Sequence, residues 1–387
     1  MRKVFTAVLL FYLILHFFAP IIYYHFFGFV NLYSKIHYDI YVFKGAVLNI
    51  VSIIGTIIVI QFLPDKKTPI LPVFDYAFIF YIVCMGFFVT SLCLSGGYGA
   101  ILKGSLHGAL ISYILLFFNA SSAIGLFLFL QKKIKYVGIF IVLYVVIFAL
   151  AGSRSSIILM IIYSLILPMF ANFQEIKHKL KRFILFFSLI SPILFFYGTS
   201  VRGAVDESTF LNLIVGRISL VETSGIPIEA KEKKTMDEKL FNKKYSMNNQ
   251  LQQCLNEISP IDPFKHDVNP NQYYRAVFLG ATEASTLDSY MSMNLTLPTY
   301  IYLKTNFVLS LILTIIFLST LYYIWVIKSD NLYFLIGIIL SLYTLLQYFD
   351  WVLIVADLFR IVLTIFTLKI FNTIFKICFS RKQIDYS

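Results

Sequence analysis

The chain alternates between long apolar runs and short clusters of charged residues. Each run is about 20 residues long, the length of a helix that crosses the roughly 30 Å hydrocarbon core of a bilayer. We therefore predict about ten transmembrane helices, seven within residues 1–200 and three within residues 306–387, the last followed by a basic tail. The runs begin near residues 4, 41, 73, 108, 136, 155, 183, 306, 331 and 350.

Lysine and arginine are concentrated in alternate loops, and basic residues accumulate on the cytoplasmic side of a membrane. This bias predicts that both termini are cytoplasmic and that residues 201–305 form one large periplasmic loop with short helices. The basic positions on the predicted cytoplasmic side are Arg2, Lys3, Lys66, Lys67, residues 131–135, residues 177–182, Lys328 and residues 380–383.

Composition supports an all-α polytopic integral membrane protein, because 59% of the residues are hydrophobic and only 13% are charged. The formal net charge of +12 does not indicate a nucleic-acid partner. Residues 201–300 hold ten Lys and Arg against twelve Asp and Glu, so the basic surplus lies outside the large loop and follows from topology. The sequence contains no Walker-type glycine loop and no Cys/His spacing typical of a metal site, and we expect neither cofactor nor metal.

A tight outward turn, "GSRSS" at residues 152–156, interrupts the apolar sequence and contains Arg154. Two interpretations stay open. Arg154 is either an arginine that extends from a helix end to the membrane surface, or a residue that binds an anion such as a lipid phosphate.

The large loop begins with two arginines, Arg202 and Arg217, that flank a short apolar segment followed by Glu222. The apolar positions in residues 210–222 have helical spacing, which predicts an interfacial helix on the membrane surface. Arg217 and Glu222 are five positions apart and so do not form the usual i,i+4 salt bridge. The alternative is that both charges are simply solvated or contact lipid headgroups.

The rest of the loop is polar. Residues 229–244 have mixed charge and are predicted to form a solvated helix without a chemical role. Residues 259–280 are rich in Pro, Asn and Asp, which is typical of a loop. The side chains considered there for chemistry are His266 as a general base or merely a solvated residue, Tyr273 and Tyr274 for sugar binding, Arg275, and farther on the carboxylates Glu283 and Asp288.

The last predicted span contains three charged residues, Asp350, Asp357 and Arg360. Asp357 and Arg360 are i,i+3 neighbours and could neutralise each other in lipid. Such a pair is either a structural link between helices or, together with Asp350, the floor of a site that opens outward.

The layout of the spans, the single late outer loop, the "GSR" turn and the stretch "VRG…GRISLVE" resemble the Wzy-type O-antigen or oligosaccharide repeat-unit polymerases of bacteria. The resemblance covers the whole chain in layout. One pattern of that family, a glycine eleven positions after an arginine, is not found here. Those positions after the four outer arginines hold Leu165, Leu213, Ile228 and Thr286.

The resemblance implies a multi-pass glycosyltransferase of the bacterial inner membrane that needs no cofactor or metal. It would join undecaprenyl-pyrophosphate-linked oligosaccharide repeat units into O-antigen or capsular polysaccharide at the periplasmic face. Its partners would be the lipid-linked glycans, membrane lipid, and a chain-length regulator and flippase of the same pathway. A flippase for the lipid-linked unit and an O-antigen ligase are the alternatives.

This chemistry needs groups that stabilise the departing pyrophosphate and a base that deprotonates the acceptor hydroxyl. Arginine binds phosphate oxygens in pairs, whereas a carboxylate or a histidine can act as the base. The predicted pyrophosphate ligands are Arg154, Arg202, Arg217 and Arg275, the candidate bases are Glu222 and then His266, and the candidate substrate-binding residues are Tyr273, Tyr274, Glu283 and Asp350.

Overall fold

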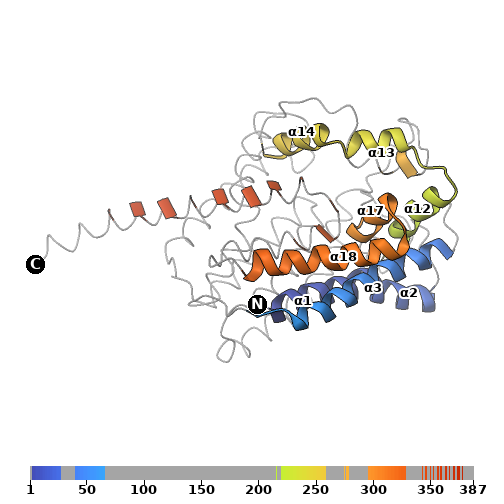
Figure 1. Cartoon of the computed structure of the whole chain (residues 1–387), viewed down its shortest axis with the longest axis horizontal. Coiled ribbons are helices and arrows are strands. Elements are labelled where there is room, and N and C mark those ends of the chain that lie inside the picture. Colours follow the sequence, from blue (N-terminus) through green and yellow to red (C-terminus); the bar gives the residue numbers. More distant parts are fainter. Residues whose placement is uncertain are drawn as a thin grey trace, which may run out of the picture. The chain divides into compact units, whose positions relative to one another are not determined.

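A computed structural model describes residues 2–27, 40–65, 219–258 and 295–327, together with single positions at 215, 274, 276–278 and within 342–377. All regular structure in these residues is helical (Figure 1), as expected for an all-α protein. The chain divides into two compact units, and every helix described below belongs to the unit made of residues 1–67, 208–330 and 338–356.

Three helices are long and apolar enough to cross a membrane: Arg2–Phe26, Ile40–Phe62 and Phe307–Ile324. They coincide with the predicted spans that begin near residues 4, 41 and 306. This agreement supports a membrane-embedded protein. The other predicted spans lie wholly or largely outside the described residues, so their number and the orientation of the termini stay predictions.

The first span is one helix interrupted by a wider π-helical turn. It consists of α1 (Arg2–Leu13), η1 (Ile14–Phe18) and α2 (Ala19–Phe27), and the N–H of Ala19 donates to the carbonyl of Ile14, five residues back. Pro20 explains the turn, because proline has no N–H and its ring crowds the carbonyl four residues earlier. That carbonyl belongs to His16, and it accepts a hydrogen bond from the N–H of Leu220 at 3.1 Å.

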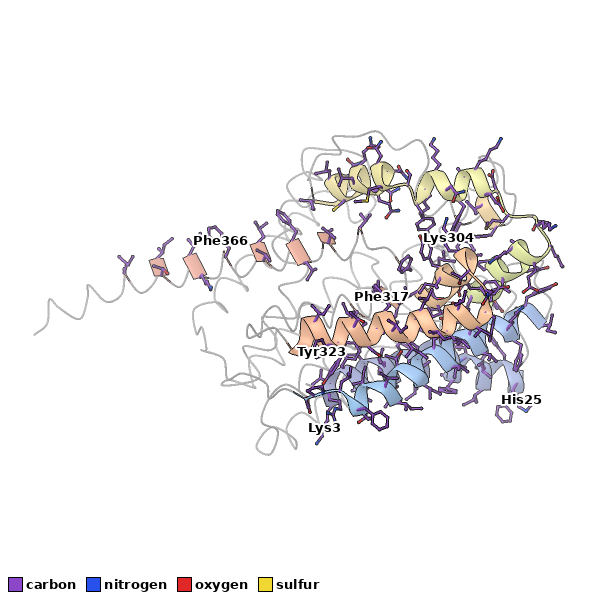
Figure 2. The ribbon with its side chains drawn as sticks, viewed as in Figure 1. Lys3, His25, Lys304, Phe317, Tyr323 and Phe366 are labelled. Carbon is purple, nitrogen blue, oxygen red and sulfur yellow. The ribbon has the colours of Figure 1, made fainter. Side chains whose placement is uncertain are left out.

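The second span, α3 (Ile40–Phe62), runs antiparallel to the first. The backbone N–H of Arg2 donates to Asp65 Oδ1 at 2.9 Å, just beyond the end of α3. We call this the Arg2 end of the bundle and the opposite one the Ile40 end. Figure 2 shows Lys3 and Tyr323 toward the Arg2 end and His25 and Lys304 toward the other.

One face of α3 is buried and includes small and polar side chains, whereas many of its apolar side chains lie on the exposed face. Gly45, Asn49, Ser52 and Thr56 are spaced by four, three and four residues and share the buried face. Small residues of this kind allow close helix packing in membranes, and lipid covers the apolar face. The most exposed apolar residues of α3 are Ile40, Phe43, Ile58 and Phe62.

The third span, α18 (Phe307–Leu321), continues into η3 (Tyr322–Ile327) and is preceded by the short helix α17 (Leu297–Lys304). Asn306 caps α18 by accepting from the N–H of Leu309 at 3.0 Å. The hydroxyl of Ser310 donates to the carbonyl of Pro298 at 2.6 Å, so α17 folds back along the start of α18. The tyrosine at the end of α18, Tyr322, donates to the carbonyl of Pro64 at 3.2 Å at the Arg2 end.

Three helices form the described part of the large loop: α12 (Val221–Glu232), α13 (Glu238–Lys244) and α14 (Met247–Ile258). Residues 229–244 do not form the single predicted helix, although most of their side chains are exposed as expected for a solvated segment. The chain turns between α12 and α13, where Lys234 has a φ of 55°, and Asp237 caps α13 by accepting from the N–H of Leu240. Both helices also contribute to the core, through Ala230 and Phe241.

Candidate functional site at the buried ends of two short helices

Helix α12 extends from the middle of the membrane-spanning bundle to its Ile40 end. At its start, Leu220 donates to the carbonyl of His16, which lies close to the middle of the first span. At its end, Lys231 Nζ donates to the carbonyls of Tyr302 at 2.6 Å and Thr305 at 2.5 Å, next to the start of α18.

Helix α17 follows a similar course. Near its start, Thr299 Oγ1 accepts from Asn49 Nδ2 at 3.4 Å, and Asn49 lies near the middle of α3. Its last residues adjoin the start of α18. In Figure 1, α12 and α17 lie together beside α3 and α18. Two short helices therefore begin at mid-depth and end at the same side of the bundle.

The contact between α12 and α3 is made by backbone against backbone at two glycines. A Cβ added to Gly225 would lie 2.6 Å from the Cα of Val42, and one added to Gly45 would lie 2.7 Å from the carbonyl carbon of Ser224. Neither distance is compatible with a side chain. The pair of glycines holds the first half of α12 tightly against the polar face of α3.

Glu222 lies in the first turn of α12 and is only 4% exposed. Within the described part of the chain its carboxylate has no hydrogen bond or ion pair. Burial disfavours the charged form and raises the pKa of the carboxyl group to about 7. A carboxyl group with such a pKa can accept or release a proton near neutral pH, which is the property required of a general acid or base.

Several polar atoms near the starts of these helices lack a hydrogen-bond partner among the described residues. A buried polar group without a partner is costly, and such groups are places where water or a polar ligand binds. The atoms on α12 and on the polar face of α3 are Thr223 Oγ1, Asn49 Oδ1 and Ser52 Oγ, and α18 adds Thr314 Oγ1.

Tyr274 is buried at 4% exposure and packs in the core of the loop helices. Its hydroxyl donates to the carbonyl of Thr223, so it fixes the first turn of α12, one residue from Glu222. A role for Tyr274 in substrate binding stays a prediction. The structure does bring together two of the predicted site residues, although they are 52 positions apart in the sequence.

The other end of α12 carries an ionic cluster. Lys44 pairs with Glu232, and the hydroxyl of Tyr302 donates to Glu232 Oε1 at 2.5 Å. The hydrogen bond from Lys44 has the larger effect and that from Tyr302 the next, and both lower the pKa of Glu232. Lys231 lies 4.6 Å from the ring centre of Tyr302, and burial lowers its pKa. Lys231 is therefore a partly buried capping residue for α17, a role that the prediction for residues 229–244 did not include.

The interfacial helix predicted over residues 210–222 is not continuous, because it is interrupted before residue 221. Ser219 and Leu220 lie outside any helix, and α12 begins afresh at Val221. These residues are buried in the bundle and not on its surface, because the carbonyl of His16 and the glycine contact draw the chain inward.

The remaining predicted site residues lie outside the described residues, and their roles stay predictions. They are Arg154, Arg202, Arg217, His266, Tyr273, Arg275, Glu283 and Asp350.

Sequence reasoning missed the contribution of the second span. Asn49, Ser52 and Thr56 repeat on one face of an otherwise apolar helix, and this pattern marks the side that packs against protein. It was visible in the sequence. The hydrogen bond that the His16 carbonyl accepts from Leu220 had a weaker signal in the sequence, namely Pro20, which lies four residues after His16.

Comparisons of the chain with protein-family models, with curated proteins and with solved structures find no match.

Proposed function

We propose that this chain is a membrane glycosyltransferase that polymerises undecaprenyl-pyrophosphate-linked oligosaccharide repeat units at the outer face of the bacterial inner membrane. The observation that carries the proposal is Glu222, a buried carboxyl group with a pKa of about 7 at the start of a helix that enters the membrane. Glu222 would take the proton from the acceptor hydroxyl as the new glycosidic bond forms. The leaving group is the lipid pyrophosphate, which arginines of the outer loops would stabilise.

Two properties of Glu222 suit this role. Its carboxylate has no hydrogen bond or ion pair in the described structure that would compete with a substrate hydroxyl. Burial also strengthens the carboxylate as a base relative to a solvated glutamate, since a higher pKa means a greater affinity for the proton. The unpaired hydroxyl of Thr223, the next residue, offers a hydrogen bond to the same substrate.

The test is a surface-glycan gel of the host bacterium after deletion of the gene and its replacement by variants. Glu222→Gln keeps the shape of the side chain but cannot accept the proton, and it should leave a core that carries a single repeat unit. Glu229→Gln is the matched control, because Glu229 lies on the same helix in a surface ion pair with Lys233, and it should restore the ladder. A full ladder with Glu222→Gln would rule out Glu222 as the base.

A second candidate is a translocase that moves the lipid-linked unit across the membrane. It is favoured by α12 and α17, since paired helices that start at mid-depth occur around the substrate sites of transporters. The same gel separates the candidates. Deletion of a translocase would leave no repeat unit on the core, whereas deletion of a polymerase leaves one.

A further inference from the structure

Helix α14 is polar on its buried side and apolar on its exposed side. Met247, Leu251 and Leu255 are 72%, 51% and 43% exposed and follow one another at four-residue spacing along one face. A helix on a water-exposed surface has the opposite arrangement. The buried face carries amide side chains that are at most 5% exposed: Gln250, Gln253 and Asn256.

The preceding helix, α13, leads α14 away from the Ile40 end of the bundle. Lys304, at the end of α17, donates to Asn242 Oδ1 at 2.8 Å, whereas the ring of Tyr245 lies 5.0 Å from that of Tyr300, one turn earlier in α17. Helix α13 is therefore antiparallel to α17. Because α17 runs from mid-depth to the Ile40 end, α13 runs from the Ile40 end back toward mid-depth. Figure 1 shows α14 continuing in the direction of α13.

The apolar face of α14 is consequently presented at the level of the membrane spans. Within the same unit, α3 and α18 also expose apolar side chains, for example Ile58 at 54% and Ile316 at 56%, and in a membrane such faces contact lipid. Helix α13 has two exposed lysines, Lys239 and Lys243. They precede α14 in the chain and lie nearer than α14 to the Ile40 end. Lysines at that level match the phosphates of lipid headgroups.

We propose that the apolar stripe of α14, made of Met247, Leu251 and Leu255, contacts the acyl chains of the bilayer. Helix α14, Met247–Ile258, then dips into the half of the membrane at the Ile40 end, while the start of α13 stays in water. The amide face of α14 is turned toward the protein, where Gln250 Oε1 has no partner among the described residues. This surface is independent of Glu222, so it stands whether or not the proposed polymerase activity does.

The experiment measures which phase surrounds the stripe. The four native cysteines are replaced by alanine, and a bimane fluorophore is attached to the Leu251→Cys variant of the full-length protein. The protein is reconstituted in vesicles of phosphatidylethanolamine and phosphatidylglycerol. Quenching by doxyl-labelled lipid is compared with quenching by aqueous iodide. Glu238→Cys, at the exposed start of α13, is the matched control.

Lipid should quench the probe at Leu251→Cys and iodide should not, with the opposite result at Glu238→Cys. The ratio of the lipid to the iodide quenching constant should be about tenfold higher at Leu251→Cys than at Glu238→Cys, because the doxyl group is confined to the bilayer and the iodide ion is excluded from it. Leu255→Cys should behave as Leu251→Cys does, which guards against a local effect of one substitution. Strong iodide quenching at both stripe positions would place the stripe in water, and weak quenching by both agents would show that protein covers it. Either result overturns the proposal.

Discussion

Replacing Glu222 with glutamine should change how the stability of the protein depends on pH. Burial raises the pKa of this carboxyl group from its usual 4.5 to about 7 in the folded protein. Between these two values the folded protein retains a proton that the unfolded chain has released. Stability must therefore fall as the pH rises through this range.

The magnitude follows from the shift in pKa. One pKa unit corresponds to about 1.4 kcal/mol, so the full rise to about 7 costs the folded state about 3 kcal/mol once the pH is well above 7. Glutamine is neutral at every pH and does not incur this cost. The Glu222→Gln variant should therefore match the wild type at about pH 5 and exceed its stability at about pH 9.

The assay is thermal unfolding of purified protein in detergent, followed by tryptophan fluorescence between about pH 5 and about pH 9. Glu229→Gln, which removes the same charge from the exposed face of α12, controls for net charge. Melting curves of Glu222→Gln and wild type that stay parallel over the whole range would refute the reasoning, because they would show that folding imposes no cost on the charged carboxylate.

Three further predictions concern the same helix and its surroundings. Gly225→Ala should destabilise the protein by about 1–3 kcal/mol in the same melting assay, since its new Cβ meets backbone, whereas Gly55→Ala meets only the side chain of Ile315 and should cost less. Lys231→Met should lower the melting temperature because two carbonyls at the end of α17 lose their donor, while Lys233→Met on the exposed side should not; equal effects would contradict the capping role. Arg217→Lys should abolish most glycan polymerisation although the charge is kept, because lysine cannot bind phosphate with a bidentate fork; a normal ladder on the surface-glycan gel would remove the proposed contact.

The three described spans could be predicted from the sequence because their signal is local. A continuous apolar run near residues 4, 41 or 306 is enough to identify a membrane helix, whatever its neighbours are. Even the boundaries agree closely with the structure. The same local reasoning indicated Glu222, although only as the carboxylate nearest to two arginines.

The loop helices could not be predicted because their position depends on distant partners. The apolar residues of 219–232 alternate with polar ones such as Glu222, Thr223 and Ser224, so no continuous apolar run indicates burial. The segment is drawn into the bundle by a carbonyl that Pro20 frees in the first span and by the glycine Gly45 in the second. Lys231 likewise looks solvated in the sequence, and its hydrogen bond to the carbonyl of Tyr302 at the end of α17 is seen only in the structure. Interactions over more than 70 positions leave no periodic pattern.

The buried polar face of α3 has a consequence for how the protein is made. Asn49 finds its partner Thr299 only after another 250 residues have been added to the chain. At a synthesis rate of about 5–20 residues per second, Thr299 follows Asn49 by roughly 10 to 50 s. During that time α3 can hold two of its polar groups itself, because the amide of Asn49 donates to the carbonyl of Gly45 and the hydroxyl of Thr56 donates to that of Ser52. The order of synthesis thus leaves the first two spans to complete their packing late, because the hydroxyl of Tyr12 in the first span donates to the carbonyl of Leu346, 334 positions farther along the chain.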